Sequence, residues 1–321
     1  MNELLVFICD GAPVRGEIVS ISSAWQAVLE RRNDPPVVKR ILGDFVAAAT
    51  LLSASLKFDG TLIIQAQSKG PIQLLVVECK SDLTMRATVK LSVDPASIDP
   101  NATLGELLDA NNTGRLVITL DPSDRQPGQA PYQGIVALQE HRGTVIKPVT
   151  SAAEAIALYM QNSEQLDTRI WLASNDTHVG GLLLQRLPDS GGHAHLDPQL
   201  AAEGWTRIQT LGETITNEEL LTLSPDTILR RLFLEESTES GVRSFPPRPV
   251  RFSCRCSRTK VADILRMLGE EEVESILAEQ GAVETECDFC AKAYCFDAVD
   301  CRQVFKTDLL ADATRPPSSG H

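Results

Sequence analysis

Eight cysteines are distributed unevenly along the 321-residue chain, and six of them lie in roughly its last fifth. A secreted disulfide-rich scaffold would be shorter, richer in cysteine and more evenly cross-linked. Thiols that cluster in a reducing compartment indicate metal or redox chemistry instead. The clustered residues are Cys254, Cys256, Cys287, Cys290, Cys295 and Cys301, whereas Cys9 and Cys79 lie far from them in the sequence.

Four of these cysteines form two close pairs with the spacing of a metal site. One residue separates Cys254 from Cys256, and two residues separate Cys287 from Cys290. Four thiolates arranged as a tetrahedron make a closed structural zinc site, with Zn–S distances of about 2.3 Å. The sequence therefore predicts one zinc ion per chain, held by these four residues. Packing of buried free thiols is a poor explanation for two close pairs in so short a region.

The segment around the cysteines, residues 250–310, is predicted to be a small C-terminal domain. Two short helices, at 260–268 and 271–279, and a strand around Tyr294 and Phe296 provide only a thin apolar core. Domains of this size usually depend on a metal or a cross-link. Zinc binding would then supply folding free energy to this domain.

Zinc in such a domain has two possible roles, and the residues alone leave both open. The ion can be a permanent staple of the fold. Alternatively, the thiolates that hold it can act as a redox switch, because the thiolate is the form that oxidants attack. The cations Arg255, Arg258 and Lys260, beside the first pair, would favour the charged form of the sulfurs.

Residues 1–188 are predicted to form an α+β core domain. Asp34 and Pro35 begin a helix with one broad apolar face that extends to Leu52, and Ser151 begins a second helix. Apolar runs separated by turn residues predict strands, so we expect a mainly antiparallel sheet with helices on one side. The predicted strands are 61–67, 72–79, 84–91, 115–120, 132–138, 169–173 and 181–187.

Residues 189–249 are predicted to form a metastable helical linker between the two domains. The segment 188–196 is rich in Pro, Gly, Asp and His, which is typical of an exposed hinge. Capping patterns at Thr216 and Ser224 begin short helices, which are marginal unless their apolar faces dock on a neighbour. Residues 311–321 are expected to be a disordered tail.

The overall charge excludes several kinds of partner. The formal net charge is −13, and aromatic residues make up 5% of the chain. A non-specific nucleic-acid binder needs a cationic surface and often stacking aromatics, so we expect no nucleic-acid partner. No apolar stretch reaches the roughly 18 residues of a membrane span, and no secretory signal is apparent, so a cytoplasmic protein without a membrane partner is expected.

Segments spread over about residues 1–310 occur in the order that one known family shows. Those in the C-terminal region are Cys254-Arg-Cys-Ser-Arg258, Glu271-Glu-Val-Glu-Ser-Ile-Leu-Ala-Glu279 and Cys287-Asp-Phe-Cys290. Those in the core and linker are Val14-Arg-Gly-Glu17, Leu56-Lys-Phe-Asp-Gly60, Ser163-Glu-Gln-Leu166, Gly180-Gly-Leu-Leu-Leu-Gln185 and Glu218-Glu-Leu-Leu-Thr-Leu223. In these residues the chain resembles the heat-shock protein 33 family, the redox-regulated bacterial chaperones.

The resemblance implies a function and a set of site residues. It implies an ATP-independent holdase, not an enzyme, that is inactive when reduced and zinc-bound and is a homodimer that binds unfolding client proteins when oxidised. It implies zinc ligation by the four paired cysteines, and disulfides Cys254–Cys256 and Cys287–Cys290 after oxidation. It also implies that the linker unfolds on activation. Linker helices that lean on the zinc domain would then free the apolar residues Leu220, Leu221, Ile228, Leu229, Leu232 and Phe233.

Some features depart from this pattern or support other functions. Cys295 and Cys301 are not required by the family, and we expect inert core thiols there, although exchange with Cys287 and Cys290 is an alternative. Cys9 and Cys79 are expected to pack as small apolar residues, and His193 and His195 to lie in a solvated loop. A constitutive zinc-domain interaction adaptor is the main alternative function. A thiol–disulfide oxidoreductase would need a helix that begins at Cys287, where a strand is expected to follow the motif.

Overall fold

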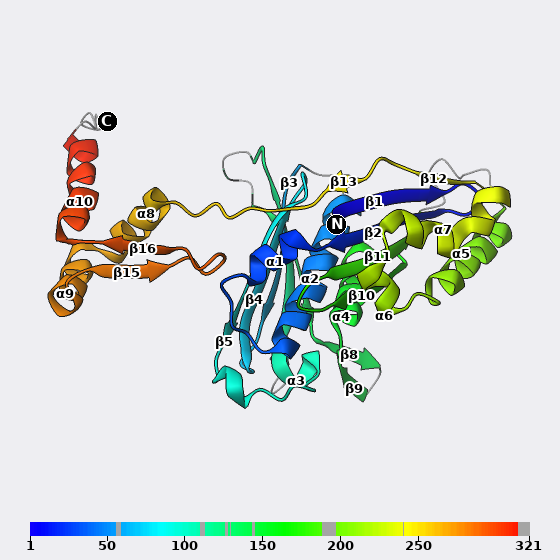
Figure 1. Ribbon diagram of the computed structural model, residues 1–321, viewed down its shortest axis with the longest axis horizontal. Coiled ribbons are helices and arrows are strands. Elements are labelled where there is room, and N and C mark those ends of the chain that lie inside the picture. Colours follow the sequence, from blue (N-terminus) through cyan, green and yellow to red (C-terminus); the bar gives the residue numbers. More distant parts are fainter. Residues whose placement is uncertain are drawn as a thin grey trace, which may run out of the picture. The chain divides into compact units, whose positions relative to one another are not determined.

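The chain folds into two compact units, Met1–Ser253 and Cys254–His321, which are described separately below. The computed structural model describes residues 1–55, 59–109, 113–125, 128, 130–142, 145–187, 197–239 and 241–313 (Figure 1). The first unit includes the helices predicted as a linker. The predicted hinge at 188–196, with His193 and His195, lies outside the described residues.

One sheet of the first unit brings the N-terminal hairpin together with strands from far along the chain. Its strand order is β10-β11-β2-β1-β12, β13 also pairs with β1, and all of these pairings are antiparallel. We call it sheet A. Its strands are β1 (Asn2–Cys9), β2 (Val14–Ile21), β10 (Thr168–Ser174), β11 (Val179–Arg186), β12 (Val242–Ser244) and β13 (Arg248–Pro249).

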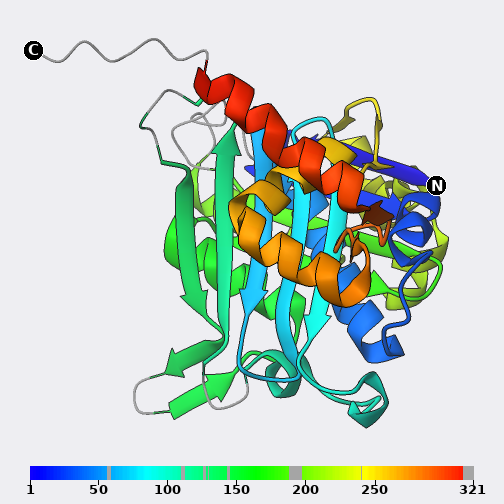
Figure 2. The same ribbon diagram turned by 90° about the vertical axis from the view of Figure 1, so that its left-hand side faces the viewer.

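The second sheet, sheet B, contains the strands that were predicted in the first half of the chain. Its order is β14-β5-β4-β3-β6-β7, and only the short β14–β5 pairing is parallel. Figure 2 shows its long strands side by side. They are β3 (Gly60–Gln67), β4 (Ile72–Lys80), β5 (Thr84–Leu91), β6 (Arg115–Pro122), β7 (Tyr132–Ala137) and β14 (Arg251–Phe252). A separate hairpin pairs β8 (Gln139–Arg142) with β9 (Val145–Pro148).

Helix α2 (Pro36–Ser55) lies between the two sheets and is buried around most of its circumference (Figure 1). Its residues share one apolar core with Val19 of sheet A and Leu62 of sheet B. The sequence predicted one apolar face on this helix, and helices on one side of a single sheet. Both predictions are wrong, because α2 is buried around most of its circumference and lies between two sheets. Small residues such as Ala47 and Ala48 form a second buried face that spacing of large apolar residues did not reveal. The predicted antiparallel α+β fold is confirmed.

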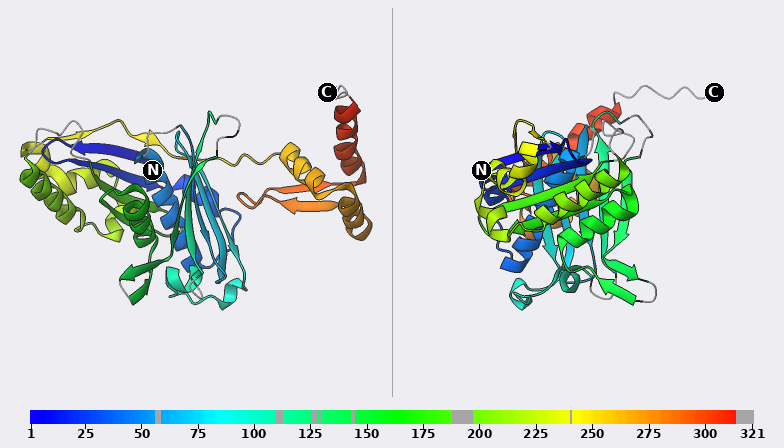
Figure 3. Two further views of the ribbon diagram at one scale, coloured as in Figure 1. Left: turned by 180° about the vertical axis from the view of Figure 1, so that it is seen from behind. Right: turned by 90° about the vertical axis from the view of Figure 1, so that its right-hand side faces the viewer.

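Helices α5 (Pro198–Gly212), α6 (Asn217–Thr222) and α7 (Pro225–Glu239) cover the other face of sheet A (Figure 3). Strand residues alternate between the two faces, so Leu4 packs toward α2 whereas Leu5 and Phe7 pack toward these helices. The helices therefore dock, as their shortness required, but on the first unit. Their buried residues are Ala201, Trp205, Ile208, Leu220, Ile228, Leu229, Leu232 and Phe233.

The first unit also contains three further α-helices, a 3-10 helix at Pro95–Ser97 and a π-helical turn at Met160–Glu164. The helix predicted at Ser151 is confirmed as α4 (Ala152–Tyr159), and the Ser151 side chain accepts a hydrogen bond from the Glu154 amide, as an N-cap does. The others are α1 (Ser23–Leu29) and α3 (Leu104–Leu108). Among the described residues, no helix is both long and apolar enough to cross a membrane.

The second unit has its own small core. It contains α8 (Arg258–Leu268), α9 (Glu270–Gln280), a hairpin of β15 (Val283–Glu286) and β16 (Ala293–Phe296), and α10 (Ala298–Ala313). Helices α8 and α9 lie where the sequence predicted them, whereas α10 was not predicted and extends beyond the expected tail boundary at 310. The core residues are Ala262, Leu265, Val273, Val283, Tyr294, Phe296, Cys301 and Val304.

Candidate metal centre

An irregular segment and a turn of the second unit carry the paired cysteines. Cys254 and Cys256 lie in the segment just before α8. Ser257 is the N-cap of this helix, and its side chain accepts a hydrogen bond from the Lys260 amide. Cys287 and Cys290 lie in the turn between β15 and β16. That turn is closed by backbone hydrogen bonds, in which the Cys287 amide donates to Lys292 (3.0 Å) and the Ala291 amide donates to Cys287 (2.7 Å).

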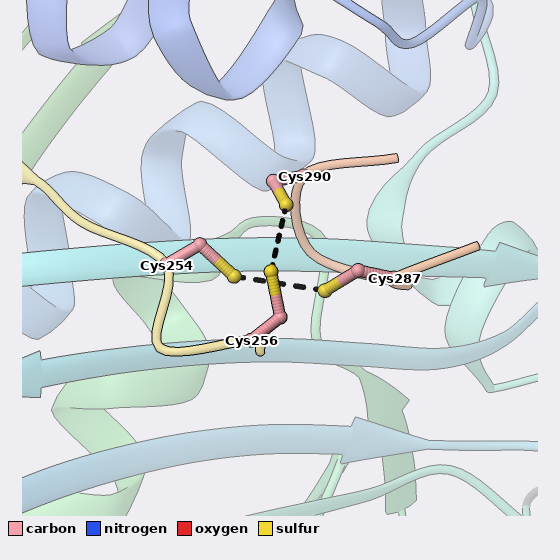
Figure 4. A group of neighbouring side chains, drawn as sticks. All are labelled: Cys254, Cys256, Cys287 and Cys290. Atoms are coloured by element: carbon pink, nitrogen blue, oxygen red, sulfur yellow. Dashed lines mark hydrogen bonds between the residues drawn. The ribbon is translucent and has the colours of Figure 1, made fainter. Parts of the chain in front are cut away.

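The fold brings all four sulfurs together (Figure 4). Their Sγ atoms lie within 4.8 Å of one another, and all four residues are half-buried. The Sγ–Sγ distance is 3.6 Å between Cys254 and Cys287 and 3.4 Å between Cys256 and Cys290. Four sulfurs at about 2.3 Å from a central ion would lie about 3.8 Å apart. The four cysteines could therefore hold one metal ion, with contacts that cross between the two pairs.

Without a metal ion, the protein groups around the four cysteines shift the thiol pKa values in opposite directions. Burial opposes ionisation of Cys256, but the Tyr294 hydroxyl and the other sulfurs outweigh burial and lower the pKa of its thiol to about 7. Burial raises the pKa of Cys290 to about 12, and three adjacent sulfurs contribute to this rise. Burial also raises the pKa of Cys287. A divalent cation favours the thiolate form of every ligand, so it would remove this conflict among the four groups.

Backbone amides support the second pair of sulfurs. The Cys287 sulfur is hydrogen-bonded by the amides of Phe289 and Cys290, and the Cys290 sulfur by the amide of Lys292. Hydrogen bonds to a thiolate favour its charged form. This donor set suits a site that carries four negative sulfurs around a cation.

Arg258 has a different role from the one expected for it. Its guanidinium donates to the Cys295 carbonyl (2.8 Å) and to Asp300 (2.6 Å), and it lies 4.1 Å from the centre of the Phe296 ring. The Tyr294 hydroxyl and the neighbouring sulfurs, rather than Arg258, lower the Cys256 pKa. Arg258 thus fastens the start of α8 to β16 and α10.

Tyr294 is a site residue that the sequence did not identify. The residue is 6% exposed, and its hydroxyl is buried without a hydrogen bond of regular geometry to any described group. Of the groups that lower the pKa of the Cys256 thiol, this hydroxyl has the largest effect. A neutral thiol is a weak acceptor and a thiolate a strong one, so this buried donor fits a site in which Cys256 is a metal-bound thiolate. The only signal in the sequence was a tyrosine four positions after Cys290.

The remaining cysteines lie in different environments. Cys301 is buried in the core of the second unit, as expected of an inert thiol, but Cys295 is exposed, so that expectation is wrong for Cys295. Cys295 lies on the outward-facing side of β16, where alternate residues point away from the core. Cys9 and Cys79 are buried in the first unit as predicted, and burial raises the pKa of Cys79 to about 12.

The turn geometry argues against the oxidoreductase alternative. Cys287 and Cys290 lie between two antiparallel strands, and β16 follows them. A redox-active pair of the thioredoxin type would lie where a helix begins, within a βαβ unit. The strand expected after the motif is therefore confirmed.

Known proteins resemble the chain over nearly its whole length. The family model described as Hsp33 protein matches residues 2–297, which include all four paired cysteines. The 33 kDa chaperonin of Chromobacterium violaceum is 44% identical and aligns over 97% of this chain and 96% of its own length. That of Methylobacillus flagellatus is 43% identical, over 95% of this chain and 94% of its own.

A solved structure has the same fold. The crystal structure of the 33 kDa chaperonin, a heat shock protein 33 homologue, from Thermotoga maritima matches 96% of this chain and 99% of its own. The TM-score is 0.72 at 20% sequence identity, so this likeness concerns the fold alone. The family match and the close relatives establish the classification: the chain belongs to the Hsp33 family of chaperones.

Proposed function

We propose that this protein is an ATP-independent holdase, whose binding of unfolding proteins is activated by oxidation of its four paired cysteines. The cluster of four sulfurs within 4.8 Å of one another is the observation that supports this proposal most directly. In the reduced form, Cys254, Cys256, Cys287 and Cys290 would hold one zinc ion. The ion would supply a cross-link to a unit whose own core is small.

Oxidation would convert the four ligands into two disulfides, Cys254–Cys256 and Cys287–Cys290. Hydrogen peroxide can supply the oxidising equivalents: for each disulfide, two zinc-bound thiolates lose two electrons, and one peroxide takes up these electrons and two protons from solvent to become two waters. A disulfide sulfur carries no negative charge and is a poor zinc ligand. Formation of both disulfides would therefore release the ion and unfold the second unit.

Residues 242–253 connect the helices of the first unit to the cysteines, and we call this segment the strap. Strands β12, β13 and β14 connect α7 to Cys254 and pair with β1 and β5. Immediately before Cys254, the Ser253 amide donates to the Met85 carbonyl at 3.1 Å. Strands of two or three residues contribute little pairing energy alone. Unfolding of the second unit would loosen the strap, and then α5, α6 and α7.

Release of these helices would uncover an apolar surface suited to unfolded chains. The face of sheet A beneath them includes Leu5, Phe7, Ile18, Leu182 and Leu184. Extended apolar surfaces of this kind bind partners that expose apolar residues. The same surface would support a homodimer of the oxidised form. We further propose that the protein acts in the cytoplasm and is not an enzyme. The net charge of −13 agrees with the absence of a nucleic-acid partner.

One experiment tests the proposal. Zinc-loaded protein is treated with peroxide at elevated temperature, and zinc release is followed together with suppression of aggregation of an unrelated unfolding protein. We expect zinc release to accompany the gain in protection, and reduction to reverse both. Equal protection by the reduced form would contradict redox gating. Retention of zinc with unchanged client binding would instead support the constitutive adaptor.

A further inference from the structure

The strap lies along the outer edge of β1, the strand that would otherwise end sheet A (Figure 1). Main-chain hydrogen bonds hold it there. The Phe245 amide donates to the Val6 carbonyl (2.9 Å), and the Val250 amide donates to the Asn2 carbonyl (3.0 Å). An extended segment of polypeptide therefore already fits this edge.

The strap is a weak strand for this position. Three of its residues from 245 to 250 are prolines, which have no N–H to donate. The register between the strap and β1 also shifts by one residue, between the Phe7–Ser244 and Leu4–Arg248 pairings. A regular strand without proline could pair with the edge continuously and supply more donors. Such a strand could replace the strap.

Side chains add little to the contact between the strap and β1. Val250 is buried, but residues 243–247 are exposed, including the ring of Phe245 at 45%. The ion pair of Arg243 with Asp10 (2.7 Å) is exposed as well, and pairs of this kind contribute little stability. The edge therefore recognises an extended backbone more than a particular sequence.

Alternate residues of β1 use opposite edges of the strand. The odd-numbered residues hydrogen-bond with β2, in the register in which the Ser22 amide donates to the Met1 carbonyl (2.8 Å). The even-numbered residues Leu4, Val6 and Ile8 turn their N–H and C=O groups toward the strap. Side chains on both faces of β1 already pack in the two cores of the first unit. The main chain is thus what this edge offers to a partner.

We propose that the edge of β1 is a client-binding site, which accepts an extended segment of an unfolding protein as an added strand once the strap has left it. Strand addition uses main-chain hydrogen bonds, so it accepts many sequences. This property suits a chaperone that binds unrelated proteins. In the reduced protein the strap occupies the site in place of a client. The inference rests on the proposed function for release of the strap, and it adds the binding mode and the class of ligand, an extended polypeptide poor in proline.

Hydrogen exchange of the wild-type protein tests this site directly. The protein is oxidised until zinc is released, and residue-resolved amide exchange in β1 is followed with and without carboxymethylated α-lactalbumin, a permanently unfolded probe. We expect oxidation to accelerate exchange of the Leu4, Val6 and Ile8 amides at least about tenfold, and the probe to reverse most of this acceleration. The Leu5 and Phe7 amides, which face β2, are internal controls and should change much less.

Four results would overturn the inference. The first is a probe that binds without changing exchange of the edge amides. The second is equal protection of both sets of amides, which would indicate binding to a face of sheet A or general stabilisation. The third is renewed protection of the Phe245 and Val250 amides by the probe, which would show that the strap itself has returned. The fourth is protection that rises with protein concentration in the absence of the probe, which would assign the edge to a second copy of the chain.

Two proline substitutions test the strap without oxidation. Phe245→Pro removes the N–H that donates to Val6, whereas Ser244→Pro removes an N–H that the register turns away from β1. Phe245→Ala controls for loss of the ring. With all three variants reduced and zinc-loaded, we expect Phe245→Pro to bind the probe at least about threefold more tightly than the other two, measured by fluorescence anisotropy. Equal affinities would overturn the inference.

The two experiments separate this inference from the proposed function. The proline comparison needs no oxidant, so a protein whose client binding ignores oxidation would defeat the proposed function and leave that comparison intact. An oxidised protein that gains client binding without any change at the edge amides would support the proposed function and defeat the inference. The exchange experiment needs no substitution, so it decides the question even if Phe245→Pro does not fold.

Discussion

Phe233 of α7 packs against Phe7 of β1, with ring centroids 5.3 Å apart and ring planes tilted by 37°. Both rings are fully buried, and the backbone of Phe233 departs from helical geometry, so α7 is kinked where it meets sheet A. This aromatic contact joins the segment predicted as a linker to the N-terminal strand. It makes Phe233 a sensitive point for testing how firmly the helices are docked.

Replacement of Phe233 by alanine should loosen α7 without touching the cysteines. Loss of a buried phenylalanine typically costs about 3–5 kcal/mol. We expect Phe233→Ala to suppress client aggregation without oxidant while it retains one zinc ion per chain, measured by light scattering and elemental analysis. Leu234→Ala is the control, because Leu234 is 60% exposed. If Phe233→Ala stays as inactive as the wild type, docking of α7 does not hide the client-binding surface.

Gly180 of β11 provides a second test of the same interface, because it lies against α6. A Cβ atom added at Gly180 would lie 2.1 Å from the Leu220 carbonyl oxygen, so the helix would have to move. We expect Gly180→Ala to increase tryptic cleavage after Arg230 and Arg231 of α7, the helix that follows α6, and to raise client binding by the reduced protein. Gly43→Ala is the matched control. Its added Cβ would lie 2.6 Å from Ser174 Cβ, a contact between α2 and β10 inside the other core. Equal effects of the two substitutions would indicate general destabilisation.

The sequence predicted elements well where local patterns determine them. The strands of sheet B and helix α4 follow from alternation, turn residues and a capping serine, and helices α8 and α9 lie where helical spacing put them. The four-cysteine cluster followed from spacing alone, because two close thiol pairs in a small domain are typical of a metal site and are rarely needed for packing.

The features that were missed depend on long-range contacts or lack a local pattern. Sheet A forms when β2 pairs with β11, whose residues lie far along the chain, and no local signal specifies that partner. Helix α5 had a local signal, since Asp197 caps it and Trp205 and Ile208 are three residues apart, but the adjacent hinge composition obscured it. The burial of Tyr294 in the core of the second unit depends on the pairing of β15 with β16 and on packing against helices from other segments, which its position in the sequence does not reveal.

Cys287→Ser should weaken metal binding and partly activate the protein. A serine hydroxyl does not replace a thiolate as a zinc ligand, so three sulfurs remain for the ion. We expect at least about a tenfold loss of zinc affinity, measured by competition with a chromophoric chelator, and partial suppression of aggregation without oxidant. The matched control is Cys295→Ser, at an exposed cysteine of the same unit. A Cys287→Ser protein that remains fully zinc-loaded and inactive would disprove the ligand assignment.

Glu17 of β2 should make the stability of the first unit depend on pH. Its side chain is fully buried, and this burial outweighs the adjacent Arg15 and raises the pKa of the carboxyl from 4.5 to about 7. The folded protein therefore binds more protons than the unfolded chain between these values. Stability must then fall as pH rises through this window, by up to about 3 kcal/mol in total.

Glu17→Gln should abolish most of this fall, because a neutral amide has no charge to desolvate. Urea unfolding near pH 5 and near pH 7.5 measures it. Tryptophan fluorescence reports the first unit alone, since the three tryptophans, Trp25, Trp171 and Trp205, all lie there. Asp44, whose pKa burial raises to about 6, contributes equally to both proteins and cancels in the comparison. Glu30→Gln, at an exposed position, should keep the wild-type slope. A Glu17→Gln protein with that same slope would show that Arg15 keeps the Glu17 carboxylate charged throughout this range.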